Sequence, residues 1–183
     1  MNSKTEIRLS MPPGYLTYRG YTDKTLRISP CNLGFGVFAN KPFAEGERIL
    51  TFKGRNISFR DTKKKGEWEC MPIQIGTGAY IDTLPLGVFV NHSCNPNAGI
   101  RDDFYLIALS SIEKDEEIRF DYSTTMQESS FTMECRCGSN RCRGIVDDFN
   151  TLPEATRYKY LEDGIVMGFI AQRYSELNGK LPD

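Results

Sequence analysis

The sequence predicts a mostly β domain of several small β-sheets, followed by a cysteine-rich knuckle and C-terminal helices. Three observations support this prediction. Short runs of β-forming residues are separated by glycine, proline, aspartate or lysine, three cysteines gather in the spacing Cys-x-Cys-x4-Cys, and apolar residues recur at helical spacing after Asn150. Short strands with frequent turn residues favour small sheets over an alternating βαβ array.

Size and charge narrow the class of protein. The chain has 183 residues, which suits one domain with small appendages. Its 39% hydrophobic and 11% aromatic content is typical of a folded globular protein. The net charge of −1 indicates neither a nucleic-acid-binding surface nor a polybasic membrane surface, and the run Lys63-Lys64-Lys65 reads as a solvated loop. We therefore expect no direct nucleic-acid site and no membrane contact.

Residues 1–25 are polar with scattered tyrosines and are interpreted as an N-terminal flank. Their first residues contain no apolar segment of the signal-peptide type, and no stretch is long enough to span a bilayer. The expected location is intracellular, in a reducing compartment such as the cytoplasm or nucleus. Export into a host cell by a system that reads another signal stays open.

The β-type runs begin at Leu26. Glycine-rich stretches at residues 45–47 and 76–78 read as turns between them. The predicted strands span residues 26–29, 36–39, 48–53, 73–75, 79–82, 104–109 and 117–119.

The segment 149–183 is predicted to be a helical tail. Pro153 stands where a helix can begin, just after Thr151 as a candidate cap, and Gly164 is expected to end that helix. A second helix is expected over residues 165–177. Their apolar residues are expected to pack on the sheets or on another subunit, so a homodimer through these C-terminal helices is one predicted arrangement.

The cysteine cluster indicates a metal site. Cys135, Cys137 and Cys142 lie within eight residues of the chain. Disulfides are typical of secreted proteins, and because no secretory signal is visible, a metal site is favoured over disulfides. Tetrahedral zinc needs four ligands, and Cys94 is the natural candidate for the fourth. Cys31 and Cys70 are the alternatives for that position, and ordinary reduced thiols in a turn are the alternative to a metal site.

The most informative string is Asn91-His92-Ser93-Cys94-Asn95-Pro96-Asn97, which contains the only histidine of the chain. Asparagine and histidine offer both hydrogen-bond donors and acceptors at fixed positions. The dipeptide Asn91-His92 alone is more often structural, in a turn. The complete string favours a binding site.

Two further motifs flank this string. Gly34-Phe35-Gly36 lies between a loop and a predicted strand, where glycines let a ligand approach the backbone. It lacks the third glycine and the following helix of a dinucleotide fingerprint. Phe120-Asp121-Tyr122 ends a predicted strand, where an aromatic pair in the core is the alternative to a functional pair.

In their order along the chain, these motifs resemble a SET domain of the protein lysine methyltransferases followed by a post-SET zinc motif. The resemblance covers residues 26–147 and is carried above all by the Asn-His-Ser-Cys string. It implies several small β-sheets with a pseudoknot, in which the segment 91–97 threads a loop near the strand before the catalytic tyrosine. The implied organisation is an N-terminal flank at 1–25, a SET domain at 26–124, a post-SET zinc motif at 125–148 and a helical tail at 149–183.

The resemblance also implies a role for each site residue. Tyr122 is expected to be the catalytic tyrosine, and Phe120 is expected to line the lysine channel and permit di- or trimethylation. Zn²⁺ is expected on Cys94, Cys135, Cys137 and Cys142. The residues expected to bind S-adenosyl-L-methionine are Gly34, Phe35, Gly36, Asn91, His92, Tyr122 and Phe149.

The chain departs from many family members at two places. It contains no nine-cysteine pre-SET cluster, and it has Met71 near the position where many members have a tyrosine facing the lysine amine. Tyr80 or Trp68 is a candidate replacement for that tyrosine.

The function implied by the resemblance is protein-lysine N-methylation. The expected partner is a protein with a lysine-bearing segment, such as a histone tail or another basic protein. The alternatives are a non-catalytic SET-like domain that serves as a scaffold and a zinc-containing interaction module in which the cysteines only fold the tail.

Overall fold

A computed structural model describes residues 13–178 of the protein. The predicted N-terminal flank and helical tail therefore extend outside the described residues, at 1–12 and 179–183. Among the described residues, no helix combines the length and the apolar character needed to cross a bilayer.

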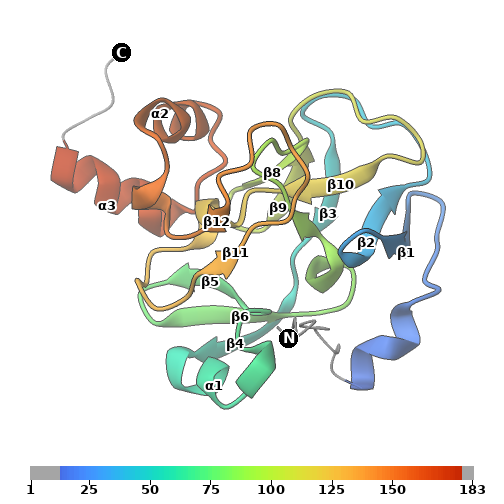
Figure 1. Ribbon diagram of the computed structural model, residues 1–183, viewed down its shortest axis with the longest axis horizontal. Coiled ribbons are helices and arrows are strands. Elements are labelled where there is room, and N and C mark those ends of the chain that lie inside the picture. Colours follow the sequence, from blue (N-terminus) through green and yellow to red (C-terminus); the bar gives the residue numbers. More distant parts are fainter. Residues whose placement is uncertain (1–12, 179–183) are drawn as a thin grey trace, which may run out of the picture.

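The described chain is built mainly from small β-sheets, as predicted (Figure 1). One four-stranded sheet carries the order β1-β2-β10-β7. Its strands are β1 (Leu26–Cys31), β2 (Gly34–Ala39), β10 (Glu117–Phe120) and β7 (Asn91–His92).

Two three-stranded sheets and one short ribbon complete the β structure. The first sheet, in the order β3-β9-β8, contains β3 (Arg48–Thr51), β9 (Tyr105–Ala108) and β8 (Ala98–Arg101). The second, in the order β4-β6-β5, contains β4 (Gly54–Ser58), β6 (Ala79–Thr83) and β5 (Ile73–Gly76). The ribbon pairs β11 (Met133–Glu134) with β12 (Ile145–Val146).

The α-helices are α1 (Phe59–Lys63), α2 (Glu154–Glu162) and α3 (Gly168–Asn178). In Figure 1, α2 and α3 lie on the side of the molecule away from β1 and β2. The 3₁₀ turns are η1 (Pro13–Tyr18), η2 (Gly66–Trp68), η3 (Gly87–Phe89), η4 (Tyr122–Thr125) and η5 (Phe149–Thr151).

The seven predicted strands are present, with ends shifted by one or two residues. The strands β4, β7 and β8 and the ribbon β11-β12 were not predicted. β4 is exposed along nearly all its length and β7 has only two residues. Neither therefore shows the alternation of apolar and polar residues by which a strand is predicted from sequence.

The helical prediction needs two corrections. Pro153, not Thr151, is the N-cap of α2, because the Thr151 hydroxyl donates to the Asp148 carbonyl inside η5. The second helix begins at Gly168 and not at residue 165. Gly164 does follow the end of α2, with a φ of 64° that suits glycine.

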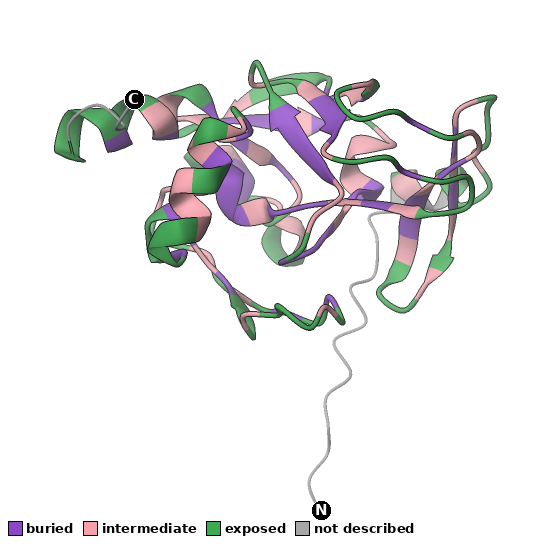
Figure 2. Cartoon of the chain, turned by 90° about the horizontal axis from the view of Figure 1, so that it is seen from above, coloured by how far each residue is buried: buried purple, intermediate pink, exposed green. Residues whose placement is uncertain are grey.

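The C-terminal helices pack on the same hydrophobic core as the sheets. Tyr160 of α2 and Ile170 and Tyr174 of α3 belong to the buried cluster that also contains Ile118 and Phe120 of β10. In Figure 2, burial runs through the middle of the molecule and onto one face of these helices. The packing of the helices on the sheets is thus confirmed, whereas the homodimer stays a prediction.

Candidate functional site

The site forms where β7 meets β10. These strands pair in parallel, with Asn91 opposite Arg119 and His92 opposite Phe120, and the Ser93 N–H donates to the Phe120 carbonyl at 3.0 Å. This pairing brings the Asn-His-Ser-Cys string next to the strand that ends at Tyr122. Two motifs almost thirty residues apart therefore share one location.

Tyr122 is held by its backbone and by its hydroxyl. The Tyr122 N–H donates to His92 Nδ1 at 3.2 Å, and its hydroxyl donates to the Val90 carbonyl at 2.8 Å. Burial is the main cause that raises the pKa of Tyr122 above its ordinary value, with smaller effects from Cys70 and Glu117. The phenol is therefore neutral at physiological pH and directed at a backbone oxygen.

Aromatic side chains surround this phenol. The ring centroid of Tyr122 lies 5.0 Å from that of Phe120 and 5.3 Å from that of His92. The Phe120 ring lies in turn 5.8 Å from Phe52 in an edge-to-face arrangement. Phe120 is buried, at 3% exposed, so its ring forms a rigid apolar wall next to the phenol.

The Gly-x-Gly motif lies directly beside Asn91. The Asn91 amide nitrogen donates to the Phe35 carbonyl at 3.0 Å and to Glu117 Oε1 at 2.8 Å. A Cβ atom on Gly36 would lie 2.3 Å from Glu117 Oε1 and 3.0 Å from the Asn91 amide nitrogen. Gly36 thus allows the backbone to approach both side chains, and Gly34 has a φ of 108° that side-chain-bearing residues rarely adopt.

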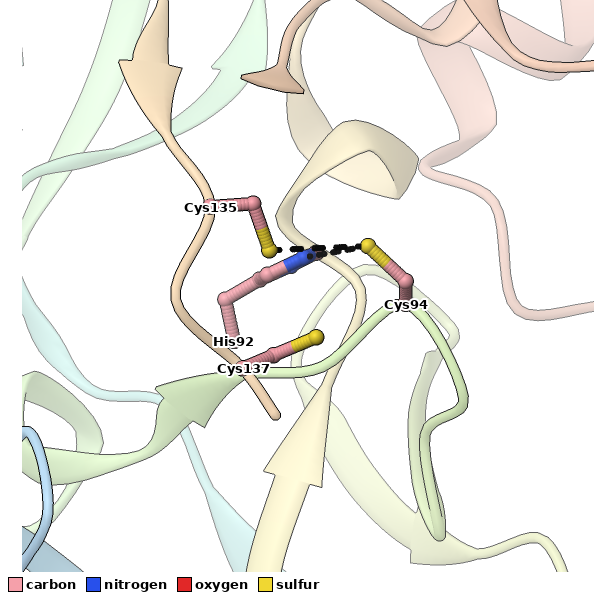
Figure 3. Close-up of side chains that lie close together, drawn as sticks. All are labelled: His92, Cys94, Cys135 and Cys137. Atoms are coloured by element: carbon pink, nitrogen blue, oxygen red, sulfur yellow. Dashed lines mark hydrogen bonds between the residues drawn. The ribbon is translucent and has the colours of Figure 1, made fainter. Parts of the chain in front are cut away.

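Three of the four predicted metal ligands lie close together, and His92, which was predicted to bind the donor, takes the place of Cys142 in the group. In Figure 3 the side chains of His92, Cys94, Cys135 and Cys137 point toward one another. Their ligand atoms all lie within 4.8 Å of one another, and the Cys94 and Cys135 sulfurs are 3.6 Å apart. Two sulfurs on one tetrahedral zinc are ~3.8 Å apart, given Zn–S bonds of ~2.3 Å. The cluster is therefore compatible with zinc.

Cys142 borders this cluster. Its thiol approaches the Cys135 carbonyl oxygen at 3.8 Å, and it lies outside the group of four residues whose ligand atoms are within 4.8 Å of one another. Cys31 and Cys70, the alternatives for the fourth ligand, are not part of the group. The Cys31 sulfur instead accepts a hydrogen bond of 3.4 Å from Asn91.

The surroundings of Cys137 favour its thiolate, whereas burial raises the pKa of the Cys94 and Cys135 thiols above the ordinary value. The Arg143 N–H points to the Cys94 sulfur at 3.4 Å and the Gly144 N–H to the Cys142 sulfur at 3.5 Å. Burial alone would raise the pKa of Cys137, but hydrogen bonds, including those from the backbone N–H groups of Cys94 and Ser139, outweigh it and lower the pKa to about 7. N–H donors around sulfur stabilise the charged form that binds metal.

The structure also places three further residues for which a role was predicted, namely Phe149 as a donor contact and Tyr80 and Trp68 as candidate replacements for the tyrosine near Met71. Phe149 is fully buried in η5 and packs edge-to-face on Tyr174 at 6.0 Å, so contact with the adenine of a donor stays a prediction. Tyr80 is 5% exposed, and its buried hydroxyl has no hydrogen-bond partner among the residues that the structure describes. Trp68 lies in η2, and its carbonyl accepts a hydrogen bond of 3.1 Å from the Met71 N–H.

Sequence reasoning missed a buried ionic network beneath the site. Asp121 is 1% exposed and accepts two hydrogen bonds from Arg143, at 2.7 and 2.8 Å, and one from the Tyr160 hydroxyl at 3.1 Å. His92 Nδ1 lies 3.5 Å from the same carboxylate. The network joins β10, the cysteine knuckle and α2, which no local sequence pattern reveals.

The sequence was also compared with protein families and with curated proteins, and both comparisons found matches. Residues 34–123 match the family model described as "SET domain". The chain is 28% identical to histone-lysine N-methyltransferase ash1 of Drosophila melanogaster over 136 residues, which is 66% of this chain and 6% of that protein. It is 29% identical over 170 residues to histone H3-lysine(4) N-trimethyltransferase ATX1 of Arabidopsis thaliana, covering 81% of this chain and 15% of the relative.

A third relative is the variant-silencing SET domain-containing protein of Plasmodium falciparum. It is 33% identical over 130 residues, which is 60% of this chain and 5% of that protein. The chain therefore spans only a small part of the length of these curated relatives.

Proposed function

We propose that this chain carries a SET domain, which the family match over residues 34–123 supports, and that it is a protein-lysine N-methyltransferase that uses S-adenosyl-L-methionine. The observation that carries this proposal is the meeting of the Tyr122 phenol with the Asn91-His92 pair, through the β7–β10 pairing and the Tyr122 N–H bond to His92. The names of the relatives, which describe histone-lysine methyltransferases, support the same activity.

In this proposal two faces of β10 serve two reactants. Gly36 and Asn91 lie on the face of Glu117 and Arg119, where the donor would bind. Phe120 points to the buried face, as the alternating burial of β10 requires, and would line the lysine channel with Tyr122. The remaining proposed donor contacts are Gly34, Phe35, His92, Tyr122 and Phe149.

The donor supplies a methyl group on a positively charged sulfur. A lysine amine has a pKa of ~10.4 in water, and an apolar channel disfavours its charged form, so the proton leaves to solvent before transfer. The N–C bond then forms as the S–C bond breaks, which yields methyl-lysine and S-adenosylhomocysteine. The Tyr122 hydroxyl and the Val90 carbonyl, already paired at 2.8 Å, would orient the amine.

Phe120 supports a capacity for di- or trimethylation. Its side chain carries no hydroxyl that would hold a water molecule against the amine, and its ring is fixed between Phe52 and Tyr122. A partly methylated amine can therefore rotate without losing a hydrogen bond to this position.

We propose Cys142, rather than His92, as the fourth zinc ligand beside Cys94, Cys135 and Cys137. His92 Nδ1 accepts the Tyr122 N–H, so the neutral imidazole carries its proton on Nε2. That nitrogen lies 3.2 Å from the Cys94 sulfur and would donate to it rather than bind the metal. Such a donor holds a ligating thiolate in place.

The substrate in this proposal is a histone tail or another basic protein, and the location is the nucleus or another compartment that contains such a protein. The relatives are named for action on histones, which supports this choice. The proposed boundaries remain 26–124 for the SET domain, 125–148 for the post-SET motif and 149–183 for the helical tail.

Mass spectrometry of core histones and basic peptides after incubation with donor tests the proposal. We expect mass increases in steps of one methyl group on lysine, and far smaller amounts of these products with Tyr122→Phe. A protein that binds the donor but modifies no lysine would support the non-catalytic scaffold instead. A protein that binds zinc and no donor would support the zinc interaction module.

A further inference from the structure

A small cavity of about 220 Å³ lies beside the Gly-x-Gly motif. It is bounded by the turn between β1 and β2, by the face of β10 that carries Glu117 and Arg119, and by residues 136–138. Its charged lining residues are Glu117, Arg119 and Arg136. Opposite charges on the walls of one small cavity favour a ligand that itself carries both signs.

Glu117 and Arg119 present these charges side by side. They stand two positions apart on β10 and therefore point to the same face of the sheet. Their side chains are 17% and 34% exposed, and Glu117 Oε2 lies 3.9 Å from Arg119 Nε. Glu117 is fixed through Asn91, and Arg119 Nη1 donates to the Cys137 carbonyl at 3.1 Å.

The amino-acid end of the proposed methyl donor has the complementary pattern, since an α-ammonium and an α-carboxylate are attached to one carbon. On the premise of the proposed function, we infer that Arg119 binds the α-carboxylate of the donor and Glu117 its α-ammonium. The Cys137 carbonyl holds the guanidinium in position, so that metal binding at the knuckle also orients a donor-binding residue.

Arg136 is the competing cation in this cavity. Its guanidinium is already paired with Glu134, at 2.7 Å, and its side chain is 66% exposed. A solvated, paired arginine contributes less to carboxylate binding than a partly buried one held by a backbone carbonyl. Arg136→Gln is therefore the matched control, because it removes the same charge from the same cavity.

Calorimetric binding of three ligands to the zinc-loaded protein separates the roles. S-Adenosylhomocysteine has both charges, its decarboxylated analogue keeps only the ammonium, and 5′-methylthioadenosine has neither. We expect Arg119→Gln to weaken S-adenosylhomocysteine binding about 10- to 100-fold and to change binding of the other two by less than about threefold. Glu117→Gln should weaken the two ligands that carry the ammonium and spare 5′-methylthioadenosine.

Three results would overturn the inference. Equal weakening of all three ligands by Arg119→Gln would mean that Arg119 acts only by supporting the Cys137 loop, and zinc content would fall with it. A carboxylate-specific loss in Arg136→Gln and not in Arg119→Gln would transfer the role to Arg136. Unchanged binding in Arg119→Gln would remove the role altogether. If the unsubstituted protein bound none of the three, the proposed function itself would fail.

Discussion

The carboxylate of Asp121 and the guanidinium of Arg143 are joined by two hydrogen bonds, with one oxygen for each terminal nitrogen. Asp121 immediately precedes the proposed catalytic tyrosine, and Arg143 immediately follows the last cysteine of the knuckle. The pair therefore connects the end of β10 to the cysteine cluster, and the Tyr160 hydroxyl connects α2 to the same carboxylate.

Removal of Arg143 should be strongly destabilising. Arg143→Met leaves the Asp121 charge buried without its partner, which costs about 3–5 kcal/mol of unfolding free energy. Urea denaturation of the zinc-loaded protein measures the loss. Arg136→Met is the control, because it breaks an exposed pair with Glu134 worth about 0–1 kcal/mol. Similar losses for both variants would show that burial of the Asp121 pair does not matter.

Tyr122→Phe should fold and bind donor but lose most methyl transfer. The change removes one hydrogen bond, to the Val90 carbonyl, which contributes about 1 kcal/mol to stability. Transfer of labelled methyl to histones gives the rate, and calorimetry gives donor affinity. Turnover close to that of the unsubstituted protein would contradict the catalytic role of the phenol.

Cys142→Ser should lower the zinc content of the purified protein, because the metal would lose one of four thiolates. His92→Gln should keep one zinc per chain, since we expect the imidazole to donate to Cys94 rather than bind the ion. Metal analysis after dialysis reports both, with Cys70→Ser as a control outside the cluster. Zinc retained in Cys142→Ser but lost in His92→Gln would reverse the assignment.

Gly36→Ala should impair donor binding more than folding. The new methyl group would meet Glu117 Oε1 and the Asn91 amide, both ends of side chains that can move at modest cost. Their displacement distorts the donor face, so we expect at least about a tenfold loss of donor affinity. Gly76→Ala is the control, because its Cβ would meet only the Ala79 side chain, at 3.6 Å. Equal donor affinity in both variants would argue against a binding role for the Gly-x-Gly motif.

Asp23 should contribute stability that depends on pH. Partial burial alone would raise its pKa, but hydrogen bonds from the Tyr21 hydroxyl and the backbone N–H groups of Leu26 and Thr25 outweigh it and lower the pKa to about 2. Because the folded pKa lies below the unfolded value of ~3.9, the contribution is complete above pH ~5 and shrinks as the pH falls toward 2.

Asp23→Ala is therefore expected to cost about 1 kcal/mol at pH 7 and less at pH 3, the modest value reflecting the exposure of the carboxylate. Denaturation of both proteins at the two pH values measures this difference. A cost that stays constant or grows on acidification would contradict the sign.

Much of the fold was readable from the sequence because strand alternation and turn residues are local properties. The runs that became β1 and β10 have apolar residues at every second position, so their existence could be predicted. β4 and β7 could not, since an exposed strand and a strand of two residues are defined by their partners rather than by their own side chains.

The sequence by itself determined which chemical groups are present and in what order: the Gly-x-Gly motif, the Asn-His-Ser-Cys string, the tyrosine after β10 and the cysteine knuckle. Only the tertiary structure decided how they meet. The parallel pairing of β7 with β10 and the Asp121–Arg143 pair both join residues more than twenty positions apart. Contacts of this kind depend on how the whole chain packs, and no local pattern of residues encodes them.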